Sequence, residues 1–133
     1  MKHRLIALAL LLVVPIALAA PPRAIPGITA KDTFPAGCVD CHVKEHRISV
    51  LLKAPTLKKK HPPVATKDIP ASCMKCHAAT SKTIPPLAPL MHRIHLAKGD
   101  ASEFVKQFDG ECTHCHKLDK ATGKWSLPKG AEK

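Results

Sequence analysis

The sequence predicts a small, mainly helical domain with extensive irregular loops and little or no β-sheet. Three observations support this fold class. The 133 residues include 13 prolines, which interrupt regular structure along the whole chain. No segment alternates apolar and polar residues in the way that a half-buried strand would. Short segments with helical spacing of apolar residues lie between the prolines, and several begin at a repeated cysteine motif.

Residues 1–19 have the three regions of a secretory signal peptide. A positively charged start, Met1-Lys2-His3-Arg4, precedes an apolar run from Leu5 to Leu18 and a small-residue cleavage region. A retained membrane anchor is the alternative, but the run is short for a span of ~20 residues and contains Pro15. We therefore expect cleavage after Ala19 and export to the periplasm, and no later segment is expected to cross a membrane.

The rest of the chain divides into three parts. Residues 20–33 are rich in proline and predict an extended N-terminal arm. Residues 34–125 form the predicted domain, and residues 126–133 form a basic C-terminal tail. Five helices are predicted in the domain, and they cover residues 39–53, 72–79, 89–97, 102–108 and 112–118. Pro55 stops the first helix, Pro89 starts the third, and Gly99 closes the third. A turn is predicted at residues 121–123.

One pentapeptide of the form C-x-x-C-H occurs three times in the domain. The copies are Cys38-Val-Asp-Cys41-His42, Cys73-Met-Lys-Cys76-His77 and Cys112-Thr-His-Cys115-His116. They begin 35 and 39 residues apart and use all six cysteines. This is the attachment signature of c-type haem. The two thiols add to the haem vinyl groups, and the histidine that follows becomes an axial ligand of the iron. The sequence therefore predicts three haem c groups, with His42, His77 and His116 as proximal ligands.

The cysteines have two other interpretations besides haem attachment. Six cysteines in a short exported chain can form three disulfides, and C-x-x-C pairs with histidines can bind zinc. Neither explains why a histidine directly follows the second cysteine of every motif. Haem attachment is therefore the favoured interpretation.

Few large apolar side chains are available to build a core. The aromatic residues are Phe34, Phe104, Phe108 and Trp125, and there is no tyrosine. Because small domains with little apolar material need a further source of stability, we expect the three haems to form the core. The chain without haem is expected to fold poorly.

Histidines outside the motifs are the candidates for the second axial positions. His92 and His95 are three residues apart in a predicted helix, so they share a face one turn apart and can ligate two different haems. His61 precedes Pro62-Pro63, which restricts its backbone, and it is the third candidate. His46 is the alternative to His61, although it follows His42 too closely to reach the far face of the same haem. The weaker candidates are His114, Met74 and Met91.

With these motifs in view, the chain resembles the multihaem cytochromes c of the class III kind. It is most similar to small periplasmic triheme members and to the haem domains of periplasmic flavocytochromes. The resemblance rests on the three C-x-x-C-H motifs, on His92-x-x-His95 before the last motif, and on the few residues per haem. It implies a small multihaem fold, bis-histidine ligation and electron transfer. One departure from the family is that the third distal ligand has no motif of its own in this sequence, so its assignment to His61 is an inference.

The favoured function is periplasmic electron transfer between respiratory donor and acceptor proteins, with no catalytic residues. The alternative is a haem-containing reductase, or a subunit of one, whose single open iron position acts on a small nitrogen or sulfur oxyanion. Five histidines after the signal peptide are not proximal ligands, and they exceed the three positions to be filled, which favours the carrier.

The chain is strongly basic, and the charge bears on its partners. Removal of Lys2 and Arg4 with the signal peptide lowers the formal net charge from +11 to +9. Export argues against nucleic acid as the partner of this charge. We expect periplasmic or membrane-bound redox proteins with acidic docking surfaces.

Overall fold

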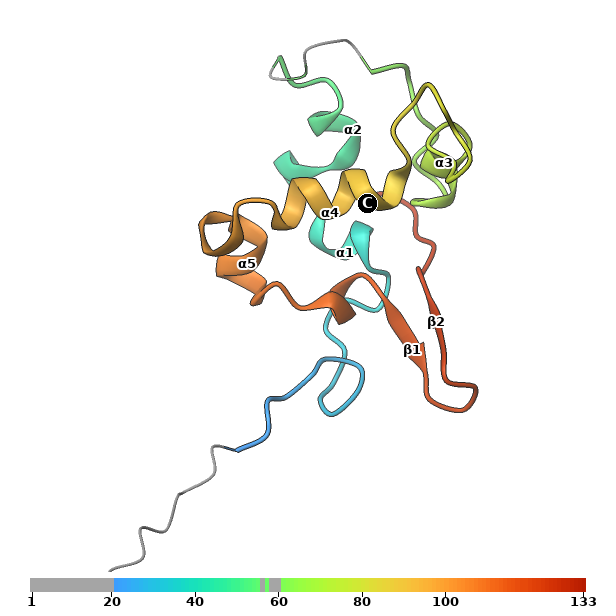
Figure 1. The fold of residues 1–133 in the computed structure, drawn as a ribbon. Helices are drawn as coiled ribbons and strands as arrows, with labels where there is room; N and C mark the ends of the chain where they lie inside the picture. The colour runs from blue at the N-terminus through green and yellow to red at the C-terminus, as the bar shows by residue number, and fades with distance from the viewer. Residues whose placement is uncertain (1–20, 56, 58–60) are drawn as a thin grey trace, which may run out of the picture.

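A computed structural model describes residues 21–55, 57 and 61–133, and Figure 1 shows its fold. The predicted signal peptide, residues 1–19, lies outside the described residues. The described part is mainly helical, with five α-helices and one sheet of two strands, so the predicted fold class is confirmed at this level. That haems form the core remains a prediction.

The predicted helix over residues 39–53 is wrong, because the chain forms three short turns there. They are α1 (Cys38–Cys41), the 3-10 helix η1 (Lys44–His46) and α2 (Ile48–Leu51). The helix stops at His42, where φ is −84° and ψ is 78°. The His42 ring nitrogen Nδ1 is 2.8 Å from the carbonyl oxygen of His46, an oxygen that a continuous helix would bond to a backbone N–H four residues later.

The middle of the chain agrees better with the prediction. The second helix is shorter than expected, α3 (Ala71–Met74), whereas α4 (Leu87–Leu96) and α5 (Glu103–Phe108) match two predicted helices. Pro89 lies in the first turn of α4, where the missing N–H leaves no helical hydrogen bond unmade. A 3-10 helix, η2 (Gly99–Ala101), connects α4 to α5. In Figure 1, α4 crosses the middle of the molecule.

The third motif leads into a β-hairpin, so the predicted helix over residues 112–118 is also wrong. One 3-10 turn, η3 (Cys112–His114), is followed by β1 (Lys117–Asp119) and β2 (Lys124–Ser126). The strands are antiparallel, and Leu118 lies opposite Trp125. The predicted turn at residues 121–123 is confirmed: the Asp119 carboxylate accepts from the N–H groups of Ala121 and Thr122, and Gly123 has a φ of +67°.

The C-terminal segment is hydrogen-bonded to two distant parts of the chain. Ile69 and Gly130 exchange backbone hydrogen bonds of 2.8 and 2.9 Å. The Glu132 N–H donates to the Thr66 carbonyl, and the Glu132 carboxylate accepts from the Ser49 N–H at the start of α2. Residues 130–132 therefore connect the neighbourhoods of the first and second motifs.

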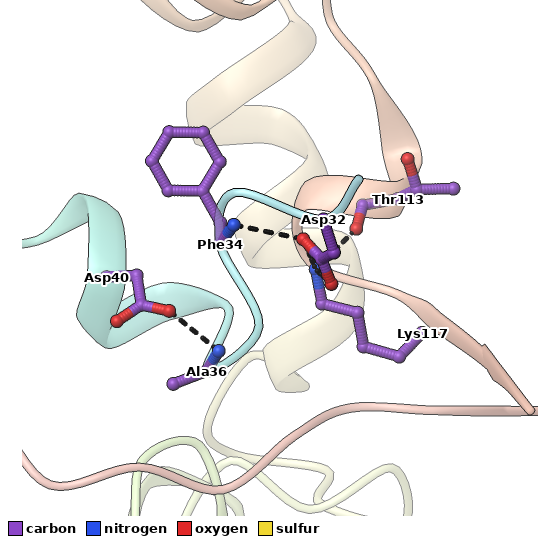
Figure 2. Close-up of polar contacts among 6 residues, drawn as sticks. All are labelled: Asp32, Phe34, Ala36, Asp40, Thr113 and Lys117. Carbon is purple, nitrogen blue, oxygen red and sulfur yellow. Dashed lines mark hydrogen bonds and ion pairs between the residues drawn. The ribbon is translucent and has the colours of Figure 1, made fainter. Parts of the chain in front are cut away.

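An ion pair holds the N-terminal arm against the third motif, as Figure 2 shows. The Lys117 ammonium lies 3.0 Å from the Asp32 carboxylate and donates to the Thr113 carbonyl at 2.7 Å. Asp32 also accepts from the Phe34 N–H at 2.9 Å. Burial raises the pKa of Asp32, but the hydrogen bonds from Lys117 and Phe34 and the Lys117 charge outweigh it, so the pKa lies below its usual value.

Apolar burial is sparse. Among the described residues, Val39 and Ile69 are the buried hydrophobic side chains, while Trp125, Ile94, Val50 and other large apolar residues are exposed. A small cluster forms beside the third motif, where Phe34 lies edge-on to Phe108 and to His114 at ring-centre distances of 5.5 and 4.9 Å. This packing is thin for a domain of this length.

Candidate functional site

Each motif histidine lies beside one of the three histidines predicted as second ligands. The pairs are His42 with His95, His77 with His61, and His116 with His92. In all three pairs the distance between ring centres is 6.0 Å. The structure therefore brings the six predicted histidines together in pairs, and each pair joins a motif to a segment outside it.

This distance matches two imidazoles on opposite sides of one metal ion. A metal–imidazole bond is about 2 Å long and the ring centre lies about 1 Å behind the bonded nitrogen, so the two centres come roughly 6 Å apart. The interplanar angles are 83°, 11° and 49°. Such variation is compatible with axial ligation, because each ring can rotate about the metal–nitrogen bond without changing the distance.

Ordinary aromatic packing would not select this one distance. Packed aromatic rings have centres anywhere from about 4.5 to 7 Å apart, and the His61–His77 pair lies within that range. The other aromatic contacts of the described residues have ring-centre distances scattered from 4.9 to 6.4 Å. Among these other contacts one value, 5.5 Å, occurs twice, whereas all three histidine pairs have the same value.

In four of the six rings a hydrogen bond fixes which ring nitrogen carries the proton. The Nδ1 atoms of His42, His77, His61 and His95 lie 2.7–2.9 Å from the carbonyl oxygens of His46, Pro85, Pro62 and Met91 respectively. Since a carbonyl oxygen only accepts, each Nδ1 carries the proton and donates. Nε2 is then left with its lone pair, which is the arrangement of histidines that ligate metals.

The first pair also favours the neutral form of its motif histidine. Burial lowers the pKa of His42, and this effect outweighs the hydrogen bond to His46, which raises it. The nearby His95 lowers it further. A neutral imidazole is the form that ligates a metal.

Helix α4 supplies two of the partner histidines. His92 and His95 are one turn apart in α4 and lie against His116 and His42, which belong to the third and first motifs. The end of the helix is held in place by Ser102, whose hydroxyl donates to the His95 carbonyl. Phe104 of α5 packs edge-on against the His95 ring at 5.5 Å.

The six motif cysteines are free thiols in the structure, so the disulfide alternative finds no support there. Burial is the main cause that raises the pKa of four thiols, those of Cys38, Cys41, Cys73 and Cys115. Neighbouring thiols add to this effect: Cys115 raises the pKa of Cys38, and Cys41 raises that of Cys115. The first and third motifs are therefore close in space.

The remaining candidates have other roles in the structure. His46 provides its backbone carbonyl to His42 while its own side chain is 71% exposed, a contribution that no sequence signal indicated. His114 is buried among aromatic rings, and within the described part of the chain its Nδ1 has no hydrogen-bond partner. Met74 is exposed, and Met91 provides its carbonyl to His95.

Within residues 21–55, 57 and 61–133, no three His, Cys, Asp or Glu side chains converge on a common metal position. In the same residues, no helix is long and apolar enough to span a bilayer.

No family model, no curated protein and no solved structure matches the chain.

Proposed function

We propose that the chain is an exported, periplasmic electron-transfer protein that carries three covalently attached c-type haems. In this proposal each iron has two histidine ligands: His42 with His95, His77 with His61, and His116 with His92. The observation that carries it is the recurrence of one ring-centre distance, 6.0 Å, in three pairs that each join a C-x-x-C-H histidine to a histidine outside the motifs.

The roles of the chain's own residues follow from the site. The six cysteines anchor the groups covalently, and the six histidines close both faces of each metal position. The carbonyl partners of Nδ1 hold the rings of His42, His61, His77 and His95 in a fixed orientation. When bound, the haems supply one-electron redox chemistry, and paired histidines give a lower reduction potential than histidine with methionine.

The sparse apolar packing supports the same proposal. Val39 and Ile69 cannot stabilise a domain of this length, and many large apolar side chains stay exposed. Three large, mostly apolar macrocycles would bury such side chains. The basic charge of the chain fits acidic donor and acceptor proteins of a respiratory chain.

The reductase alternative needs one iron with an open position. Each motif histidine has a partner at the same distance, so this pattern favours the carrier. Electron paramagnetic resonance separates the two functions. A carrier with three bis-histidine haems gives only low-spin ferric signals at neutral pH, and a stoichiometric high-spin signal would support the reductase.

Expression together with a cytochrome c maturation system tests the proposal. We expect a red protein with three haems per chain in the pyridine haemochrome assay. Replacing both cysteines of one motif by alanine should remove one haem at a time, and the three motifs act as controls for one another. A colourless protein that binds zinc, or one with three disulfides, would contradict the proposal.

A further inference from the structure

The β1–β2 hairpin has one apolar face. Side chains alternate across a strand, so Leu118 and Trp125, which are directly opposite, share a face that excludes Lys117 and Ser126. Leu127, two residues after Trp125, continues this face. We call Leu118, Trp125 and Leu127 the apolar hairpin face. Trp125 is 53% exposed and Leu127 is 37% exposed.

The N-terminal arm occupies the other side of the hairpin. Lys117 is bonded to Asp32, and Lys120 in the turn donates to the carbonyl of Ile28 at 2.7 Å. These contacts use lysines and not the three residues of the apolar hairpin face. In Figure 1 the hairpin extends away from the helices.

The apolar hairpin face continues from the third motif. β1 begins one residue after His116, and His116 is two residues before Leu118, so alternation places these two residues on the same side. Leu127 follows β2 by one residue, and extending the register by one pair beyond the strands would bring it opposite His116. The face therefore lies on the side toward which the third motif presents its histidine.

Trp125 is also exceptional among the aromatic residues of the chain. The three phenylalanines pack with one another and with His114, whereas the single tryptophan is left exposed. An indole offers a large flat apolar surface, which suits contact with a planar aromatic macrocycle.

We propose that the apolar hairpin face is one wall of the third haem site, with Trp125 packed against the macrocycle held by Cys112, Cys115 and His116. This assignment rests on the proposed function. In it, Trp125 is a positioning residue that keeps water from one side of the third haem. Removing this apolar cover lets solvent stabilise the more charged ferric form and lowers the reduction potential.

Proton NMR of the fully reduced, haem-loaded protein tests the contact directly. The chain has one tryptophan, so its indole resonances are unique. We expect them to be displaced from free-indole positions by the ring current of the macrocycle. In a Cys112→Ala/Cys115→Ala protein, which loses only the third haem, they should return toward those positions. Undisplaced indole resonances in the wild-type protein with three haems would overturn the inference.

Spectroelectrochemical titration gives a second readout. Trp125→Ala should lower one of the three midpoint potentials and leave the other two unchanged, and Trp125→Phe should restore most of the difference. Lys124→Ala, on the opposite face of the same strand, is the matched control and should change none of the three selectively. Three unmoved potentials in Trp125→Ala would contradict the inference.

Other occupants of the face give different results. If the face binds an anionic membrane or a second copy, Trp125→Ala will abolish sedimentation with phosphatidylglycerol vesicles or convert a dimer to a monomer. Either result, with unshifted indole resonances, overturns the inference while the haem count still supports the proposed function. A chain without haem would instead refute the proposed function itself.

Discussion

At the scale of single residues, hydrogen bonds to backbone carbonyls decide how the histidines can act. Four of the six paired rings donate from Nδ1, which leaves Nε2 free. The acceptors are backbone carbonyl oxygens, for example those of His46 and Pro85. A carbonyl carries no sequence signature, so the orientation of these rings could not be predicted from residue types.

Replacing a partner histidine should open one iron. We expect His61→Ala, His92→Ala and His95→Ala each to convert one of three haems from low-spin to high-spin, because alanine removes the second axial ligand. Ferric absorption and electron paramagnetic resonance spectra measure the change.

His46→Ala is the matched control for these variants. Its side chain is exposed, and only its backbone carbonyl bonds to His42, so alanine preserves that contact. The spectra should remain those of the wild-type protein. If His46→Ala and not His61→Ala produced a high-spin haem, the pairing of His61 with His77 would be wrong.

At the scale of elements, the chain departs from the predicted helices where side-chain hydrogen bonds and close contacts take the place of regular structure. Pro89 and Gly99 correctly predicted helix α4, in which His92 and His95 lie one turn apart. The prediction of one long helix over residues 39–53 was wrong because the His42 ring competes for the His46 carbonyl. The hairpin was missed because strands of three residues are too short for an alternating pattern to be recognised.

The ion pair between the arm and β1 should make stability depend on pH. The pKa of Asp32 is lower in the folded chain than in the unfolded chain, so its contribution is fully present above the unfolded value near 3.8. It is lost as the pH falls through the folded pKa. We expect Asp32→Asn to cost about 1 kcal/mol at pH 7, since the pair is partly exposed.

Denaturant unfolding of the haem-loaded protein at pH 7 and near pH 3 measures this effect. The difference in the free energy of unfolding between Asp32→Asn and the wild type should shrink as the pH falls toward 3. Glu103→Gln, which changes an exposed carboxylate of α5, is the control and should show a much smaller difference. A constant Asp32→Asn difference over this pH range would argue against an ionic role.

The C-terminal segment depends on a close approach at Gly130. A Cβ atom there would come 2.2 Å from Cγ2 of Val39, a buried residue within the first motif. Gly130→Ala should therefore destabilise the haem-loaded protein by roughly 1–3 kcal/mol, as overpacking does. Thermal and denaturant unfolding measure the loss.

A double substitution isolates the cause. Val39→Ala removes the atom that the new methyl group would meet, so Gly130→Ala should cost less in that background than in the wild type. Equal costs in both backgrounds would show that the clash with Val39 is not responsible. The sequence could not predict this contact, because residues 39 and 130 meet only in the folded chain.

At the scale of the whole molecule, the chain is organised around its three motifs and has little independent packing. Residue types and spacing predicted that His61, His92 and His95 would turn toward the motifs, and each of them lies beside a motif histidine. The sequence did not predict which of these histidines lies beside which motif. That pairing depends on how α4 crosses between the first and third motifs. That these pairs bind haem iron remains a prediction.

The haem-free chain should lack a cooperative fold. We expect a variant with all six cysteines replaced by alanine to give weak helical circular dichroism and no sigmoidal thermal transition, because so few apolar side chains are buried. The haem-loaded wild type, measured under the same conditions, is the control. A cooperative melt of the haem-free variant would show that the polypeptide supplies its own core.

The pairing of histidines also sets an order of assembly. His61 precedes His77 and His92 precedes His116, so in a chain exported as we propose the second and third sites would have both histidines as soon as their motifs emerged. The first site is different, because His95 comes 53 residues after His42. A chain that crossed a membrane from its N-terminus would therefore hold its first motif incomplete until α4 emerged, and the second site would be complete before the first.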